Sequence, residues 1–223
     1  MQEKNKNSRN KNILKTEYFF GFKNSDLVVC QTEFYRQYML LLEWDDSVTT
    51  YFQPNLNIVL SGSSKILFID FWVVREKHET ELVHFYFSEK MHAELLKAGN
   101  EHARRLNIKF SPVQAGSVLK MPFADNLERL WAHTREEFST IHISIAQSLF
   151  KKENETTVEE LENIFEANGF KKGAIYSMIF HKLINAANLE NEPLSPNTKI
   201  SLNPDFKFRS SPFGIRNPQY TAF

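Results

Sequence analysis

The sequence predicts a mixed α/β fold followed by a small helical region, and three observations support this prediction. Apolar residues recur at helical spacing between Thr32 and Glu43. Apolar runs typical of strands follow between residues 55 and 87. Near Glu136 the composition shifts, and the remaining pattern is predominantly helical. The chain is therefore expected to hold an α/β part and a smaller helical part.

Length and composition narrow the class of protein. A chain of 223 residues with 42% apolar content can bury one large core or two small ones. The formal net charge is zero, so no overall field indicates a nucleic-acid or membrane partner. Cys30 is the single cysteine, which excludes an internal disulfide and fits a reducing cytosol. With no run near the roughly 20 apolar residues of a membrane span and no secretory signal, a cytoplasmic location without membrane partners is expected.

The composition divides the chain into four predicted segments. Residues 1–16 are polar and basic, which predicts a disordered leader, with a DNA-contacting arm as the alternative. Residues 17–136 form the α/β part and residues 137–202 the helical part. Residues 203–223 are an extended tail that alternates aromatic and basic side chains. This tail is interpreted either as a peptide that docks on a partner or as a segment packed on its own domain.

The elements of the α/β part are read from hydrophobic periodicity and turn residues. They are a hairpin over Glu17–Val29, a helix over Thr32–Glu43, a hairpin from Asn55–Leu60 and Lys65–Val74, a strand over Leu82–Phe87, a helix from Ser88 to Arg105, a strand over Asn107–Phe110 and a helix over Pro122–Arg135. Because side chains alternate along a strand, Phe68, Asp70 and Trp72 are expected on one face. His84 and Tyr86 share a face of the next strand for the same reason.

The helical part carries clearer end signals. A helix is expected over Ile141–Phe150, and Thr157 with Glu160 forms a capping box for the next helix, which Gly169 closes. A third helix is expected from Lys172 to Ala187, followed by two short strands around Asn197. This order predicts a winged-helix-like domain.

Residues 31–48 (QTEFYRQYMLLLEWDDSV), followed by Gln53-Pro54, resemble the N-terminal domain of the TnsA family. TnsA proteins are the endonuclease subunits of heteromeric transposases. The run Ile69-Asp70-Phe71-Trp72-Val73 is similar to the acid-bearing strand of that family, and residues 126–131 (NLERLW) are similar to the end of its first domain. Residues 193–202 (PLSPNTKISL) are similar to the end of its helical second domain. The resemblance covers about residues 18–202.

The resemblance implies a PD-(D/E)xK fold, similar to restriction endonucleases, and metal-dependent chemistry. In such families a helix-borne Glu, a strand-borne Asp and a Glu/Gln-x-Lys pair act together. The carboxylates hold Mg²⁺, a cation that prefers oxygen ligands. The metal polarises the phosphate and helps to generate the attacking hydroxide, while the Lys stabilises charge in the transition state.

Carried over residue by residue, the resemblance retains only Asp70. The family Glu falls on Tyr35, and the Glu/Gln-x-Lys pair falls on His84 and Tyr86. A neutral phenol is a poor Mg²⁺ ligand and supplies no ammonium charge. Losing one such electrostatic group typically costs about 2.7–4 kcal/mol of transition-state stabilisation. The sequence therefore predicts a site that is degenerate as a nuclease.

Three neighbours are candidates to substitute for the lost groups. Glu33 lies two residues before Tyr35, about 200° around the helix. His84 beside Asp70 is a ligand type for Mn²⁺ or Zn²⁺, although such a pair is more often a simple hydrogen bond. Lys90 lies one turn into the following helix. The competing interpretation is that Tyr35, Tyr86, Phe68 and Trp72 fill the old cleft with an aromatic core.

The resemblance therefore leads to two hypotheses about function. In the first, the chain is a transposition protein without nuclease chemistry that assembles with a DDE-type transposase, an ATP-dependent regulator and transposon-end DNA. In the second, it is an active Mg²⁺-dependent endonuclease that cuts the 5′ ends of the element with relocated residues. A third hypothesis, a DNA-associated protein without a role in transposition, is also open.

Overall fold

The computed structural model describes residues 17–24, 27–30, 32–60, 64–118 and 121–205 and confirms the mixed α/β class. Its largest sheet has the strand order β3–β6–β7–β8. The first two pairs are antiparallel and β7–β8 is parallel, so the sheet is mixed. The strands are β3 (Val48–Phe52), β6 (Phe71–Arg75), β7 (Thr80–Tyr86) and β8 (Lys109–Gln114). The sequence pattern had not indicated β3.

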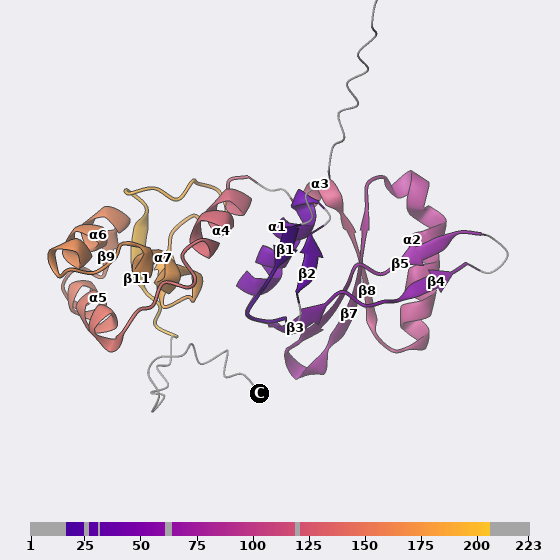
Figure 1. Ribbon diagram of the computed structural model, residues 1–223, viewed down its shortest axis with the longest axis horizontal. Helices are drawn as coiled ribbons and strands as arrows, with labels where there is room; N and C mark the ends of the chain where they lie inside the picture. The colour runs from indigo at the N-terminus through magenta and orange to yellow at the C-terminus, as the bar shows by residue number, and fades with distance from the viewer. Residues whose placement is uncertain (1–16, 25–26, 31, 61–63, 119–120, 206–223) are drawn as a thin grey trace, which may run out of the picture.

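Helices cover both faces of this sheet (Figure 1). On one face, Met39 of α1 shares a core with Phe71 of β6, and both side chains are fully buried. On the other face, Ala103 of α2 shares a second core with Leu82 of β7. The helices of this part are α1 (Glu33–Trp44), α2 (Glu89–Arg105), α3 (Ala115–Val118) and α4 (Phe123–Trp131). The layered arrangement places the strand-borne candidates between α1 and α2.

Two antiparallel hairpins flank the main sheet. They are formed by β1 (Glu17–Phe19) with β2 (Val28–Cys30) and by β4 (Asn57–Val59) with β5 (Ile66–Phe68). The single strand expected over Lys65–Val74 is wrong, because the chain leaves β5 at Ile69 and Asp70 and enters the main sheet as β6. A 3₁₀ turn, Glu76–His78, then connects β6 to β7.

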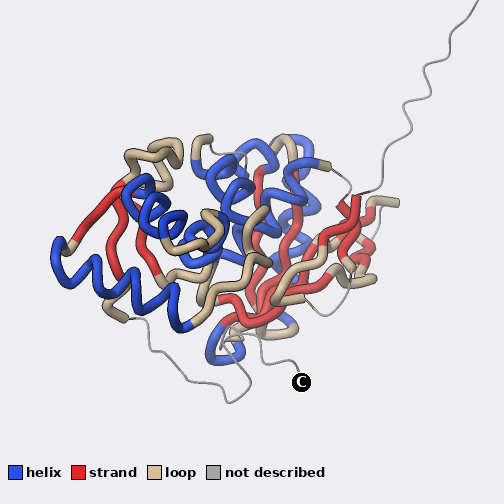
Figure 2. The backbone as a smooth tube through the Cα atoms, turned by 60° about the vertical axis from the view of Figure 1, so that its left-hand side comes forward, coloured by secondary structure: helices blue, strands red, loops and turns tan. Residues whose placement is uncertain are grey.

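The second part has its own core and its own small sheet. Figure 2 shows the three-stranded sheet, in the order β10–β11–β9, apart from the four-stranded sheet. The elements are α5 (Thr140–Glu153), β9 (Glu155–Thr157), α6 (Val158–Ala167), α7 (Gly173–Phe180), β10 (Ile184–Ala186) and β11 (Lys199–Leu202). The capping box is confirmed, since Thr157 accepts from the Glu160 N–H and Glu160 accepts from the Thr157 N–H. Gly169 follows α6 with a φ of 76°, as the sequence indicated.

The third helix is shorter than the sequence indicated. A helix continuing to Ala187 is wrong, because α7 ends at Phe180 and Lys182 turns the chain with a φ of 55°. Residues 184–186 then pair with β11 instead of continuing the helix. Strand pairing to a segment 14 to 18 residues away overrides a local helical pattern here, since Ile184 pairs with Leu202 and Ala186 pairs with Ile200.

The two parts pack against each other through α4 and α7. Asn126 donates to the carbonyls of Leu189 and Glu192, both at 2.7 Å, and accepts from the Leu194 N–H. Every residue of α7 from Ala174 to Phe180 is buried. The helix therefore lies inside the molecule.

Side chains at the end of α7 also contact the first part. The Lys182 ammonium lies 2.6 Å from Asp46 and over the ring of Trp44. The basic pair His181 and Lys182 thus faces the α/β part, and burial lowers the pKa of His181 to about 4. An imidazole with this pKa is neutral at neutral pH.

A buried carboxylate fixes the approach of the chain to α1. Glu43 is 3% exposed and accepts from the Phe22 N–H at 3.1 Å, the Lys23 N–H at 3.2 Å and the Tyr51 hydroxyl at 2.8 Å. Lys23 in turn donates to the carbonyls of Leu42 and Asp45, which satisfies the C-terminal end of α1. Burial lowers the pKa of Lys23 to about 8.

Several expectations lie outside the described residues. These include the leader over residues 1–16 and the tail from residue 206 onward. The division at residue 136 stays a prediction. None of the helices in the described ranges combines the length and the apolar character that crossing a bilayer requires.

The close approach at Gly21 gives a stability prediction. A Cβ at this position would lie 2.0 Å from the Glu43 Oε1 and 2.7 Å from the Tyr51 hydroxyl. Gly21→Ala is therefore expected to lower the free energy of unfolding by at least about 2 kcal/mol in urea denaturation, through overpacking and loss of buried hydrogen bonds. Gly116→Ala is the matched control, because a Cβ there meets no atom within 4 Å. Equal stability of the two variants would contradict the role given to Glu43.

Candidate functional site: the Asp70 cluster

Asp70 lies where the chain passes from β5 into the main sheet. Its N–H donates to the Val83 carbonyl at 2.9 Å, which holds its backbone beside β7. One carboxylate oxygen, Oδ2, accepts from the Phe85 N–H at 2.7 Å and lies 3.2 Å from the Nδ1 of His84. The side chain is 12% exposed. Asp70 therefore lies in the connection between β5 and β6 and not within a strand as the sequence indicated, and it is largely buried and bonded to β7.

Tyr35 closes the other side of Asp70. Its hydroxyl donates a short hydrogen bond to the Oδ1 of Asp70, from the first turn of α1. The ring is packed among Phe34, Phe71 and Phe85, with centroids 5.0 to 5.7 Å away. Burial, together with the nearby Asp70 carboxylate, raises the pKa of the Tyr35 phenol. Tyr35 is therefore a neutral donor across the physiological range of pH.

His84 and Tyr86 lie on the α2 side of β7. The Nδ1 of His84 is 2.9 Å from the Phe68 carbonyl, which favours the tautomer with the proton on Nδ1. The Nε2 atom of His84 is buried and has no hydrogen-bond partner among the described residues. The rings of His84 and Tyr86 each lie close to His92 of α2, with centroids 6.1 and 6.3 Å away. Sequence reasoning missed His92, because its nearness depends on how α2 packs on the sheet.

The two other candidates are exposed. Glu33 is the first residue of α1, and Lys90 is the second residue of α2. Among the described residues, the polar partners of the Asp70 carboxylate are Tyr35, His84 and the backbone of Phe85. Neither Glu33 nor Lys90 belongs to this set.

The expected aromatic filling of the cleft is correct for Tyr35 and wrong for Phe68 and Trp72. Phe68 is 58% exposed on the β4–β5 hairpin. Trp72 stacks on Phe52, with ring centroids 6.0 Å apart and planes 13° apart. The break between β5 and β6 separates Phe68 from Trp72, so the strand alternation expected across it does not apply. Phe34, Phe71 and Phe85 form the aromatic surroundings instead.

The described residues do not fit Mg²⁺. This cation requires near-octahedral oxygen coordination and is usually held by one or two carboxylates. Both Asp70 oxygens accept from protein donors, and a phenol stands where the resemblance implies the second carboxylate. Within the described ranges, no group of three or more His, Cys, Asp or Glu side chains is placed to hold a metal. The arrangement is that of a hydrogen-bonded structural cluster.

Removing the Tyr35 hydroxyl tests this structural role. Tyr35→Phe is expected to lower the free energy of unfolding by about 1.5–3 kcal/mol, the usual value for a hydrogen bond to a charged group. Tyr38→Phe is the matched control, because the described contacts of Tyr38 include rings of the same cluster, Phe71 and Phe85. Urea denaturation with an unchanged m-value measures both. If Tyr35→Phe lowers the free energy of unfolding by no more than Tyr38→Phe does, the stabilising role of the hydrogen bond between Tyr35 and Asp70 is contradicted.

Comparisons with known proteins assign no family to this chain. The sequence matches no protein-family model, and no curated protein matches it. The likeness to the TnsA family therefore rests on the segments quoted above, and the activity and partners that it implies are proposals. What the geometry establishes independently is an acid, Asp70, whose oxygens are bonded to α1 and β7.

Proposed function

We propose that the chain is a TnsA-like subunit of a heteromeric DNA transposition machinery that has lost nuclease chemistry and acts in assembly. The observation that carries this proposal is the hydrogen bond from Tyr35 to Asp70. It occupies the acid with a protein donor at the place where the resemblance implies a metal. In this proposal the partners are a DDE-type transposase, an ATP-dependent regulator and transposon-end DNA.

The chemistry of the site supports loss of cleavage. Phosphodiester hydrolysis by this class of nuclease needs a metal held by carboxylates and a fixed cation near the developing charge. Tyr35 and Tyr86 place phenols at two of these positions, and His84 replaces the third group. The Tyr35 phenol remains protonated because burial raises its pKa. No other acid or cation among the described residues contacts Asp70.

The fold is compatible with the domain assignments that the resemblance to the TnsA family implies. We propose that residues 17–136 are the restriction-endonuclease-like domain and that residues 137–202 are winged-helix-like. The order α5–β9–α6–α7–β10–β11, with the sheet order β10–β11–β9, is compatible with that second assignment.

The burial of α7 bears on what the second domain binds. In winged-helix and related domains the last helix of the helical core enters the DNA groove. Here that helix is buried between the two parts, and Lys182 pairs with Asp46. The exposed surface of α6 carries Glu159 and Glu166, which would repel phosphate. We therefore propose that this domain contacts protein partners.

A nicking assay decides between assembly and catalysis. The full chain is incubated with supercoiled plasmid carrying a transposon end, in a titration of Mg²⁺ and of Mn²⁺. We expect wild type, Asp70→Ala and the exposed-acid control Asp125→Ala to give the same background of nicked circles, with and without the transposase. Metal-dependent nicking that is lost in Asp70→Ala and kept in Asp125→Ala would contradict the proposal. That result would support an active endonuclease that uses Asp70 with Glu33, His84 or Lys90.

A further inference from the structure

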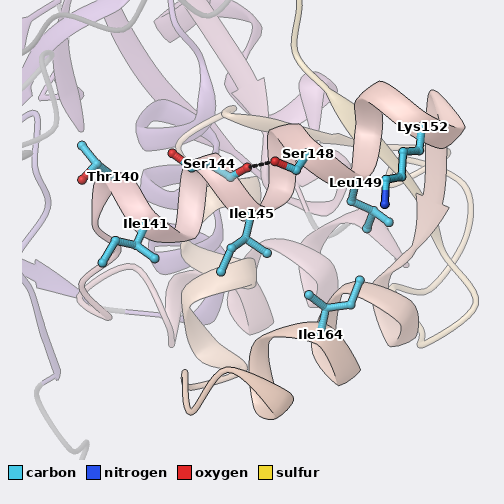
Figure 3. A pocket seen from close by; sticks show the side chains of 8 residues that line it. All are labelled: Thr140, Ile141, Ser144, Ile145, Ser148, Leu149, Lys152 and Ile164. Carbon is cyan, nitrogen blue, oxygen red and sulfur yellow. Dashed lines mark hydrogen bonds between the residues drawn. The ribbon is translucent and has the colours of Figure 1, made fainter.

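The outer side of α5 carries an apolar groove that the proposed function does not use. The groove has a volume of about 430 Å³ and lies between α5 and α6 (Figure 3). Ile141, Ile145 and Leu149 line it from α5, and Ile164 lines it from α6. Ile141 is 58% exposed. We call this hollow the α5 groove.

The apolar residues of α5 extend from the buried core to the groove. Ile143, Ala146 and Phe150 face the core of the second part. Ile141, Ile145 and Leu149 follow one another at a spacing of four residues, which puts them on one stripe of the helix surface. Ile145 and Leu149 are partly buried against the same core, and Ile141 is the exposed member of the stripe. Exposed apolar patches on a protein surface mark binding sites.

The described chain ends beside this groove. In the register of the small sheet, Ser201 of β11 faces Glu155 of β9, so Leu202 is next to the C-terminal end of α5. Asn203 is held there, because its N–H donates to the Leu183 carbonyl at 3.0 Å. The last described residues are therefore held at the C-terminal end of α5, which is the end of the helix that carries Leu149.

The segment that follows has the length to occupy the groove. Residues 206–223 would span up to about 60 Å if fully extended. The α5 helix has 14 residues and is about 21 Å long. A segment tethered this close experiences an effective concentration on the order of 1 mM, so a contact with an intrinsic Kd of ~0.1 mM would be about nine-tenths occupied.

The segment also has the complementary composition. Residues 206–223 contain five aromatic side chains, three cations and no acid; the cations are Lys207, Arg209 and Arg216. The sequence from the last turn of α5 to the last turn of α6, residues 151–166, contains six glutamates and two lysines, and one of the lysines, Lys152, lines the groove. Glu153 and Glu159 are exposed. The aromatic side chains suit the apolar lining, and the cations suit the excess of acids in this stretch of the sequence.

We propose that residues 206–223 bind in the α5 groove of the same chain, with aromatic rings against Ile141, Ile145 and Ile164 and with cations near the glutamates of α6. The segment runs back along α5 from its C-terminal end. Bound in this way, the segment covers Ile141, the exposed member of the stripe.

Paramagnetic relaxation in the full chain tests this contact. A nitroxide is attached at Ser211→Cys in a Cys30→Ala background, and the δ1 methyl groups of isoleucine are observed by NMR. We expect strong broadening of Ile141, Ile145 and Ile164, and none of Ile58 or Ile69 in the core beneath α2. Ile145→Glu should abolish the broadening of Ile141 and Ile164. Gln147→Glu adds the same charge at an exposed position of α5 and should preserve it.

Mixing experiments separate the possible occupants. Chain that carries the nitroxide but no observed methyl groups is mixed with an excess of chain that carries the observed methyl groups but no nitroxide. If the methyl signals are not broadened in this mixture, the contact is intramolecular, which supports the proposal. If the methyl signals are broadened in the mixture, the segment binds a second copy of the chain, and this result would overturn the proposal. Absence of broadening in the unmixed sample would also overturn it. If the contact is intramolecular, raising the salt concentration should weaken it, because charged groups contribute to the contact.

Discussion

The hydrogen bond between the Tyr35 hydroxyl and the Asp70 carboxylate joins the three elements that surround the candidate site. Tyr35 belongs to α1, Asp70 precedes β6, and the second carboxylate oxygen accepts from the backbone of β7. A largely buried carboxylate is costly unless donors satisfy it, so both contacts are required if Asp70 is to remain at this position. The same bonds that satisfy the buried Asp70 carboxylate also occupy both of its oxygens. In the proposed function, the loss of catalysis and the stability of the fold have this one physical cause.

A second buried acid has an analogous role at the other end of α1. Glu43 accepts from two backbone N–H groups and from Tyr51, and Lys23 satisfies the carbonyls at the end of the helix. Trp44, the last residue of α1, contacts Phe180 of α7, with ring centroids 5.7 Å apart. The α1 helix is therefore fixed at Asp70, at Glu43 and at the second part. An assembly subunit benefits from such rigidity, because partners then meet a single arrangement of both parts.

Local signals predicted some elements well and others poorly. The α1 helix and the capping box at Thr157 and Glu160 were predictable, because periodicity and capping depend on residues close in sequence. The β3 strand was missed although its five residues, VTTYF, are all β-branched or aromatic and carry a local strand signal. The end of α7 was misplaced because residues 184–186 pair with β11, a partner 14 to 18 residues along the sequence. Pairing with a distant segment leaves a weak local pattern.

The candidate site shows the same division. The resemblance placed Tyr35, His84 and Tyr86 at the family positions, but it did not show that the Tyr35 hydroxyl reaches Asp70 across 35 residues of sequence. The Phe85 N–H was not a candidate, because backbone donors carry no signature in the sequence. Phe68 was assigned to the cleft because a continuous strand was assumed through Asp70. The break that exposes Phe68 is also what turns Asp70 toward β7.

Manganese binding followed by electron paramagnetic resonance tests the central claim most directly. The account predicts that the wild-type chain leaves the signal of free Mn²⁺ unchanged, because Tyr35 and Phe85 occupy the Asp70 oxygens. Tyr35→Glu should reduce that signal, since it supplies a second carboxylate, and adding Asp70→Asn should restore it. Binding of Mn²⁺ by the wild-type chain that is lost in Asp70→Asn would contradict the account. Asp70 would then be a metal ligand, and the Tyr35 bond would be one of two states of the site.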